Sequence, residues 1–217
     1  MDDPKWNSGL KTVYKAVLPP GLRYLIYKWR HPEHRFGEKL SRLARGGIEQ
    51  FMDCLAAEGL LRGTILEIGA GAREANKRRF GGGVRNYWRS DITQWPGSKL
   101  DLFCDCTQMP FETASLDAVL CSEVLEHIRN FSQAISELSR VIRPGGYLVL
   151  TMPFFFPLHG VDKKAYGDFW RVTPGNLKII FGGAFYLLRE QTVHLFSQDD
   201  AFPVGVQQLW RRKNPNR

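Results

Sequence analysis

The chain has 217 residues and a formal net charge of +8 at pH 7, a length that suits one domain with a short appendage. No stretch approaches the roughly eighteen apolar residues of a membrane span, and no secretion signal opens the chain. The four cysteines lack the spacing of a disulfide framework, so we expect free thiols in a cytoplasmic protein. Such a protein can still contact a membrane surface through its N-terminus.

The positive charge is concentrated at the N-terminus. Residues 1–48 carry a net charge of +6, whereas residues 49–188 hold equal numbers of acidic and basic side chains. Between residues 11 and 30, apolar and aromatic side chains alternate with lysine and arginine. Such a segment can contact an anionic membrane, a lipid-linked substrate or phosphates, or pack its apolar side on the protein with its lysines solvated. We predict a basic, aromatic-rich extension over 1–48 and a catalytic domain over 49–217.

Residues 37–60 place apolar side chains at helical spacing. We expect a helix that covers the sheet and is interrupted or kinked near Gly46-Gly47. Upstream, His31 and His34 form an H-x-x-H pair, but no third and fourth ligand accompanies them, so we expect no metal site.

Residues 64–71 read T-I-L-E-I-G-A-G and form the most informative segment of the chain. The apolar run is typical of a strand covered on both faces, and Glu67 inside it needs a partner if it is buried. Gly69 and Gly71 follow where a strand-to-helix turn needs unusual dihedral angles and close approach to a ligand. Domains of the α/β class hold nucleotide-like cofactors at such turns.

Two acids distinguish between cofactors. Glu74 occupies the position of the third glycine in a dinucleotide fingerprint, where its charge would repel a pyrophosphate, so NAD and FAD are disfavoured. Asp91 ends a predicted strand over 84–90 and lies twenty residues beyond Gly71. An acid at this spacing can accept hydrogen bonds from ribose hydroxyls.

The later elements complete an α/β pattern. Strands are predicted over 100–104, 116–121 and 147–152, with polar residues after the first two. Asn130 or Ser132 would cap a helix that runs to Ile142 and is stopped by Pro144-Gly145-Gly146. Residues 185–190 and 206–211 are candidates for the last two strands. We therefore predict a Rossmann-like, mostly parallel seven-stranded sheet with helices on both faces and an antiparallel last strand.

The chain resembles the class I S-adenosylmethionine-dependent methyltransferases, in particular the small type-11 family, over roughly residues 60–190. Five ordered segments carry the resemblance: ILEIGAG (65–71), SDI (90–92), CDCTQMPF (104–111), LDAVLCSEVLEHI (116–128) and RVIRPGGYLVLTMPF (140–154). The resemblance implies a Rossmann-like sheet that binds S-adenosylmethionine.

The resemblance also implies which residues bind the cofactor. Family members usually carry a third glycine where this chain has Arg73, whose guanidinium can instead pair with the cofactor carboxylate. The implied positions are Glu67 and Gly69-Ala70-Gly71 by the methionine moiety, Asp91 with Ile92 at the ribose, Asp105 with Cys106 at the adenine, and Ser122 and Glu123 near the reacting methyl group.

Residues 152–174 follow the fifth predicted strand and are rich in aromatic side chains. The segment resembles methyltransferases found with bacterial polysaccharide and glycan synthesis, although Y-G-D-F-W-R-V-T (166–173) replaces the more frequent P-x-D-Y-x-R-Y-T. This resemblance points to O-methylation of a sugar, a lipid-linked glycan or another small-molecule hydroxyl.

A hydroxyl nucleophile benefits from a base that takes its proton. His159 is the first candidate and His127 the second, although His127 can instead hold the loop after the fourth strand. Asp168 and Arg171 either contact substrate or form a mutual ion pair that holds the loop closed.

Two other function classes stay open. Basicity alone suggests an RNA or protein methyltransferase, but the fourth strand ends in C-S-E-V (121–124) rather than the N/D-P-P-Y/F typical of amino-directed nucleic-acid enzymes. A nucleic-acid partner is therefore disfavoured. The other alternative is a non-catalytic accessory protein that binds S-adenosylmethionine.

Overall fold

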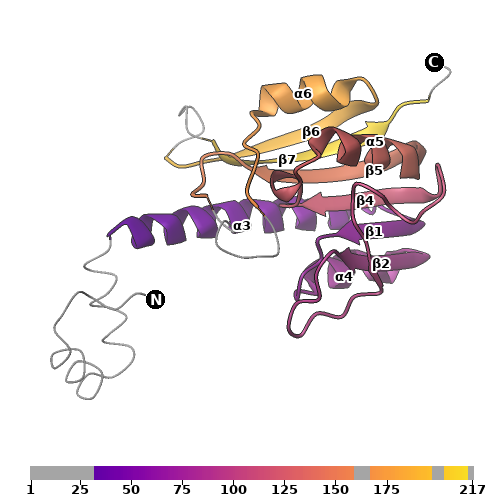
Figure 1. Ribbon diagram of the computed structural model, residues 1–217, viewed down its shortest axis with the longest axis horizontal. Helices are drawn as coiled ribbons and strands as arrows, with labels where there is room; N and C mark the ends of the chain where they lie inside the picture. The colour runs from indigo at the N-terminus through magenta and orange to yellow at the C-terminus, as the bar shows by residue number, and fades with distance from the viewer. Residues whose placement is uncertain (1–31, 159–166, 197–202, 215–217) are drawn as a thin grey trace. The chain divides into compact units, whose positions relative to one another are not determined.

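The computed structural model describes residues 32–158, 167–196 and 203–214. The chain divides into two compact units, Met1–Ser41 and Arg42–Arg217. Within the described residues, the second unit contains a seven-stranded sheet with the strand order β3-β2-β1-β4-β5-β7-β6 (Figure 1). The strands are β1 (Thr64–Ile68), β2 (Asn86–Asp91), β3 (Leu102–Phe103), β4 (Leu116–Ser122), β5 (Ile142–Pro153), β6 (Phe185–His194) and β7 (Pro203–Arg212).

The strand directions confirm the predicted fold class. Strand β7 is antiparallel to both of its neighbours, β5 and β6, whereas the pairs β1–β2, β1–β4, β2–β3 and β4–β5 are parallel. The chain builds outward from β1 to β3 and then returns to place β4 on the other side of β1. Ligands of open α/β sheets bind at such a reversal, outside the carboxyl ends of the strands.

Helices cover both faces of the sheet. Successive side chains of a strand point to opposite faces, so one strand contributes apolar side chains to a core on each side. In β4, Val119 and Cys121 belong to a core cluster with residues of α5 and α6, whereas Ala118 and Leu120 belong to a second cluster with residues of α3 and α4. The helical elements are α3 (Pro32–Glu58), α4 (Ala75–Phe80), η1 (Gly81–Gly83), η2 (Leu125–His127), α5 (Phe131–Val141) and α6 (Pro174–Gly182).

The predicted interruption at Gly46-Gly47 is wrong, because α3 is a continuous helix of 27 residues. Gly47 instead allows close packing: a Cβ there would lie closer than 3.0 Å to Val193 Cγ2 in β6. The predicted domain boundary after residue 48 falls inside this helix. Among the described helices, α3 included, none is long and apolar enough to cross a membrane.

The connection from α5 to β5 differs from the prediction. Asn130 caps α5, as one of the two predicted alternatives, and its Oδ1 accepts a hydrogen bond from Gln133 N at 3.3 Å. The helix ends at Val141, and β5 begins at once, so the Pro-Gly-Gly sequence lies within the strand. A Cβ at Gly146 would lie 2.8 Å from the carbonyl oxygen of Asp117, beside a register shift in β4. The glycines therefore admit an irregular strand pairing rather than ending the helix.

Helix α6 had no counterpart in the sequence prediction. Thr173 caps it by accepting a hydrogen bond from Asn176 N at 3.1 Å, and Pro174 occupies its first turn. Only Leu177 and Phe181 are buried, and they lie four residues apart on one side. A nine-residue helix with so narrow an apolar side produces little periodic signal.

Candidate active site

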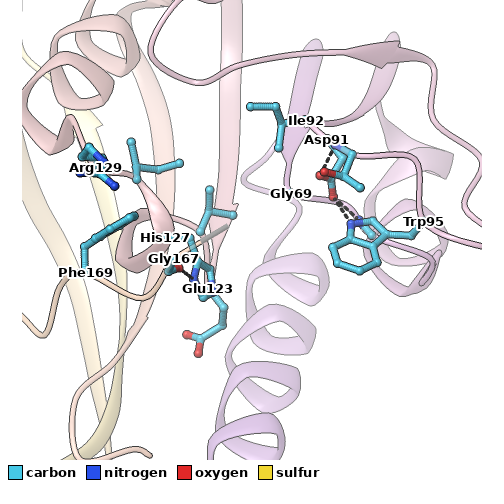
Figure 2. Close-up of a pocket in the computed structure, with 13 residues that line it drawn as sticks. Gly69, Asp91, Ile92, Trp95, Glu123, His127, Arg129, Gly167 and Phe169 are labelled. Carbon is cyan, nitrogen blue, oxygen red and sulfur yellow. Dashed lines mark hydrogen bonds between the residues drawn. The ribbon is translucent and has the colours of Figure 1, made fainter. Parts of the chain in front are cut away.

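A pocket of about 480 Å³ lies at the carboxyl ends of β1, β2 and β4. This volume falls within the range of small-molecule sites, ~300–1,000 Å³. Figure 2 shows two groups of lining side chains that face each other, one from the ends of β1 and β2 and one from the region after β4. The lining residues are Gly69, Gly71, Asp91, Ile92, Thr93, Trp95, Glu123, Val124, His127, Ile128, Arg129, Gly167 and Phe169.

Both glycines of the turn have left-handed backbones, with φ of 66° at Gly69 and 55° at Gly71. They differ in their surroundings. A Cβ at Gly69 would lie closer than 3.0 Å to Val124 Cγ2, whereas a Cβ at Gly71 would meet nothing within 4 Å. Gly69 therefore lets β1 approach the segment after β4, and Gly71 leaves space beside the pocket.

The predicted ribose acid, Asp91, lies in the first wall of the pocket. Its Oδ2 accepts hydrogen bonds from Gly71 N at 3.1 Å and from Trp95 Nε1 at 3.2 Å, and its Oδ1 accepts one from Thr93 N at 3.0 Å. These contacts orient the carboxylate and leave Oδ1 further capacity as an acceptor. The neighbouring Ile92, also predicted as a cofactor residue, is 60% exposed and lines the pocket.

Arg89, which was not predicted as a site residue, contacts backbone carbonyl oxygens of the glycine turn. Its side chain is fully buried. Nη2 lies within hydrogen-bonding distance of the carbonyl oxygens of Ala70, Gly71 and Arg73, at 3.3, 3.2 and 2.7 Å, and Nη1 donates to Lys99 O at 2.5 Å. A guanidinium carries five donors in a fixed plane, which allows one side chain to hold several carbonyls. An arginine inside a predicted core strand was the available sequence signal.

Glu67 does not line the pocket, although the resemblance implied a place beside the methionine moiety. In β1 it shares a face with Ile65, which packs toward α3 and α4. Its carboxylate accepts hydrogen bonds from Asn76 Nδ2 at 2.8 Å and Tyr87 Oη at 3.1 Å, and lies 3.7 Å from Arg89 Nε. Burial raises the pKa of Glu67, and these partners oppose the shift. The described contacts make Glu67 a structural link between β1, β2 and α4.

The second wall of the pocket is built by η2 together with residues 167–171. The carbonyl oxygen of Glu126 accepts hydrogen bonds from Phe169 N at 2.8 Å and Trp170 N at 3.2 Å. His127 Nδ1 lies 2.6 Å from Gly167 O, and the Arg129 guanidinium lies 5.0 Å from the centre of the Phe169 ring. These contacts bind a segment some forty residues further along the chain to the loop after β4.

Of the four residues predicted as catalytic, only His127 lines the pocket among those that the structure describes. His159 lies outside the described residues. His127 lines the pocket, but its Nδ1 faces the Gly167 carbonyl and must donate there, and its Nε2 lies 3.6 Å from Glu126 Oε1. This geometry suits a residue that holds the two loops together. Asp168 and Arg171 form the ion pair given as one alternative, with Oδ2 and Nη2 2.7 Å apart, and neither lines the pocket.

The remaining predicted cofactor residues do not line the pocket. Asp105 Oδ1 accepts hydrogen bonds from Thr107 N and Oγ1 at 2.8 and 2.7 Å in its own loop, and Cys106 beside it is buried. Ala70 is buried, Arg73 has an exposed side chain, and Ser122 Oγ lies 2.9 Å from Thr151 Oγ1. Six predicted residues thus meet in the pocket: Gly69, Gly71, Asp91, Ile92, Glu123 and His127.

Burial raises the pKa of two carboxyl groups after β4. Glu123 Oε1 accepts a hydrogen bond from Thr151 Oγ1 at 2.9 Å, and burial raises the pKa of Glu123 to about 7. Glu126, missed by the sequence prediction, is fully buried, and neither of its oxygens has a hydrogen-bond partner among the described residues. Burial and the neighbouring Glu123 raise the pKa of Glu126 well above its ordinary value. Within the described residues, no three His, Cys, Asp or Glu side chains are grouped to hold a metal ion.

Comparison with known proteins shows a similarity to methyltransferases. Residues 49–150 match a family model described as a methyltransferase domain. Over 65 residues the chain is 37% identical to a demethylmenaquinone methyltransferase of Mycolicibacterium gilvum, covering 30% of this chain and 28% of that protein. Over 47 residues it is 45% identical to phthiotriol/phenolphthiotriol dimycocerosates methyltransferase 1 of Mycobacterium ulcerans, covering 22% and 17%. The chain thus spans less than a third of the length of either relative.

The fold is also shared with solved structures. One of them, described as SAM-dependent methyltransferases from Methanosarcina mazei, has a TM-score of 0.53 at 18% identity and covers 69% of this chain and 92% of that one. The family match at residues 49–150 implies S-adenosylmethionine as the cofactor, and the glycine turn, the open space beside Gly71 and the oriented Asp91 carboxylate fit such a ligand. Residues 49–150 therefore match a methyltransferase domain, and the fold is shared with a solved SAM-dependent methyltransferase.

Proposed function

We propose that the protein transfers a methyl group from S-adenosylmethionine to a hydroxyl oxygen of a lipid-linked, glycan or other small-molecule acceptor. The observation that carries this proposal is the position of Glu123, a residue that lines the same pocket as the glycine turn and Asp91. A hydroxyl must lose a proton when it is methylated, and a carboxyl whose pKa is about 7 can take that proton near neutral pH.

In this proposal, the first wall of the pocket binds the cofactor and the second wall binds the acceptor. Asp91 and the glycine turn would hold the ribose and methionine parts of the cofactor, which supplies an electrophilic methyl group on a positively charged sulfur. Arg89 maintains the turn by binding three of its carbonyls. Because the sulfur is a good leaving group, alignment of the acceptor by the second wall would supply much of the rate.

The side chains of the pocket favour an acceptor with an apolar part. Ile92, Ile128 and Phe169 present apolar surface to it, and Phe169 is 42% exposed. Two partial relatives are named for apolar acceptors, demethylmenaquinone and phthiotriol or phenolphthiotriol dimycocerosates. These observations support a lipid or lipid-linked acceptor over RNA. The resemblance of residues 152–174 to methyltransferases of glycan synthesis supports a sugar hydroxyl as the methylated group.

Labelled S-adenosylmethionine tests this proposal. The purified protein is incubated with the labelled cofactor and with separate lipid, glycan, RNA and protein fractions of a bacterial extract. We expect the label to enter the lipid or glycan fraction as an ether that survives mild alkali. Asp91→Ala is the control, since the loss of a charge-assisted hydrogen bond costs about 1.5–3 kcal/mol and should weaken cofactor binding by about 10- to 150-fold.

Each other outcome would argue for another function. Label in RNA, with transfer that weakens as salt rises, would replace the proposed acceptor by a nucleic acid. Label in protein would indicate a protein methyltransferase. Cofactor binding without transfer to any fraction would identify an accessory protein.

A further inference from the structure

Exposed apolar side chains gather at the carboxyl edge of the sheet. Strands β5 and β6 are both antiparallel to β7, so β6 ends at the same edge as the parallel strands. Of the 13 large apolar side chains that are exposed in the described residues, seven lie at or beyond the carboxyl ends of β2, β3, β5 and β6 or adjoin η2 after β4. Together they are termed the apolar rim: Ile92, Phe103, Phe155, Leu158, Phe169, Trp170 and Phe196.

The apolar rim borders the candidate active site on both sides. Ile92 and Phe169 line the pocket on opposite walls (Figure 2). Phe103 pairs with the last residue of β2, which directly precedes Ile92. On the other side, Arg171 Nη2 lies 3.5 Å from the carbonyl oxygen that precedes Leu158, so this part of the rim adjoins the second wall. One surface of the protein therefore carries both the pocket and the exposed apolar side chains.

Hydrogen bonds hold the two aromatic residues of the second wall at the surface. Phe169 N and Trp170 N donate to Glu126 O at 2.8 and 3.2 Å, and Trp170 Nε1 donates to Ile128 O at 2.8 Å. Phe169 is nevertheless 42% exposed and Trp170 40% exposed. A tryptophan whose N–H is bonded and whose ring is exposed suits the boundary between water and an apolar phase. Clustered apolar surface of this kind marks sites of protein or membrane contact.

The charges on this edge favour an anionic partner. Arg129 is exposed, and its guanidinium lies 5.0 Å from the centre of the Phe169 ring. Arg73, which follows the glycine turn, is also exposed, and the exposed Arg42 lines a groove at the end of β6. Asp105 is an exposed acid on the same edge, and its Oδ1 accepts two hydrogen bonds within its own loop. Arginines can cover apolar surface with their stems while their charged ends meet lipid phosphates.

We propose that the carboxyl edge of the sheet binds an anionic lipid bilayer, with the apolar rim between the lipid headgroups and the arginines at their phosphates. The proposal rests on the function proposed above in one respect, namely an acceptor that resides in a membrane. Such an acceptor can present its hydroxyl to the pocket while its apolar part stays in the bilayer. A second protein bound to this edge would instead cover the pocket that the rim borders.

Sedimentation with vesicles tests the bilayer contact without cofactor or acceptor. The full chain is mixed with vesicles of phosphatidylcholine alone, or of phosphatidylcholine and phosphatidylglycerol in equal amounts, and its partition coefficient is measured for each. We expect tighter binding to the anionic vesicles, and this binding should weaken as salt rises. Arg129→Gln should weaken binding to the anionic vesicles about fivefold, the contribution of one basic side chain near such a surface.

Serine substitutions assign the contact to the apolar rim without changing the charge of the protein. Phe103→Ser and Leu158→Ser remove side chains that are 63% and 70% exposed and do not line the pocket. Each should weaken binding to the anionic vesicles at least about tenfold, because burial of one large apolar side chain has an effect of this size. Ile179→Ser is the matched control and should leave binding unchanged, since Ile179 is 78% exposed on α6, which covers a face of the sheet. Circular dichroism establishes that each variant is folded.

Several results would overturn the proposal. The unmodified protein binds neither kind of vesicle, or Ile179→Ser weakens binding as much as the rim variants do. If Phe103→Ser and Leu158→Ser bind as tightly as the unmodified protein, the contact belongs to another surface, such as residues 11–30. If these two variants instead change the oligomeric state in sedimentation velocity, the edge is an interface between copies of this chain. Failure to methylate any lipid or glycan fraction would contradict the proposed function itself, and vesicle binding is measured independently of it.

Discussion

At the scale of single residues, Gly69 and Gly71 have the same backbone conformation for different reasons. Both have φ near +60°, but only Gly69 is pressed against another side chain, that of Val124. Gly71 lies beside open space in the pocket wall. The sequence motif G-x-G therefore combines a packing requirement at Gly69 with open space beside the pocket at Gly71.

Alanine at each glycine should separate these two requirements. Gly69→Ala combines left-handed strain of about 1–2 kcal/mol with a clash of about 1–3 kcal/mol, so it should lower the free energy of unfolding strongly. Gly71→Ala should cost only the strain but reduce the affinity for S-adenosylmethionine at least about tenfold, a loss of ~1.4 kcal/mol. Urea unfolding and calorimetry measure the two effects. Equal stability losses in both variants would contradict the packing difference.

The buried carboxyl of Glu126 should make stability depend on pH. Its pKa in the folded protein is raised above the model value of 4.5, so the neutral carboxyl favours folding at low pH and this advantage is lost as pH rises. Above pH 4.5, the unfolded chain ionises Glu126 while the folded protein does not. Relative to Glu126→Gln, the unmodified protein should lose up to about 1.4 kcal/mol per pH unit. Urea unfolding of both proteins from pH 4 to 8 measures the difference, and a pH-independent difference would show that Glu126 ionises normally.

At the scale of elements, α3 shows that a helix can keep two adjacent glycines when one of them serves packing. Gly46 meets nothing within 4 Å, whereas Gly47 lies against Val193 of β6. Gln191 Nε2 also donates to Gly47 O at 3.4 Å. The helix continues through both positions because this part of it is supported by the sheet, which outweighs the low helix propensity of glycine.

The two glycines provide a matched pair of substitutions. Gly46→Ala should stabilise the protein by about 0.5–1 kcal/mol, since alanine loses less backbone entropy in a helix. Gly47→Ala should destabilise it by about 1–3 kcal/mol, because a valine has a stiff χ1 and cannot easily move away from the new Cβ. Adding Val193→Ala should recover part of that loss. Thermal unfolding of the three variants measures these effects, and a stabilising Gly47→Ala would contradict the close packing.

At the scale of the whole molecule, the helix that crosses residue 48 bears on the predicted two-part organisation of the chain. The sheet domain uses α3 from before that boundary, since Ile48 packs against a core cluster and Gly47 contacts Val193. A cut after residue 48 would therefore remove part of the support of the domain. A cut before Pro32 would leave α3 complete.

Two shortened chains test where the domain begins. A chain that starts at Pro32 should unfold at the same temperature as the full chain and bind S-adenosylmethionine equally well. A chain that starts at Glu49 should lose about 2 kcal/mol or more, because it lacks Ile48 and the turn that precedes Phe51. Equal stability of both chains would support the boundary at residue 48. Sedimentation of the full chain and the Pro32 chain with anionic vesicles tests membrane contact, one of the alternatives given for residues 11–30.

Much of the fold was predictable because its signals are local. The apolar run before Gly69 identifies β1, and polar residues after successive apolar runs mark the carboxyl edge of the sheet. Helix α6 and the uninterrupted α3 were not predictable in this way, since a few tertiary contacts decide them. For the candidate site, position along the chain predicted Asp91, which lines the pocket, but not Arg89, whose contacts are with three carbonyls of another segment.

The sequence by itself indicated the fold class, the cofactor and the edge of the sheet where the pocket lies, because periodicity and turn residues act within a few residues of one another. Only the tertiary structure decided which polar side chains reach the pocket. Glu67 lies on the far face of its strand, and Glu123 shares a buried cluster with Glu126 and the distant Arg171. The physical reason is that the charge state of a carboxyl depends on its burial and its neighbours, and both arise from segments that meet only in the folded chain.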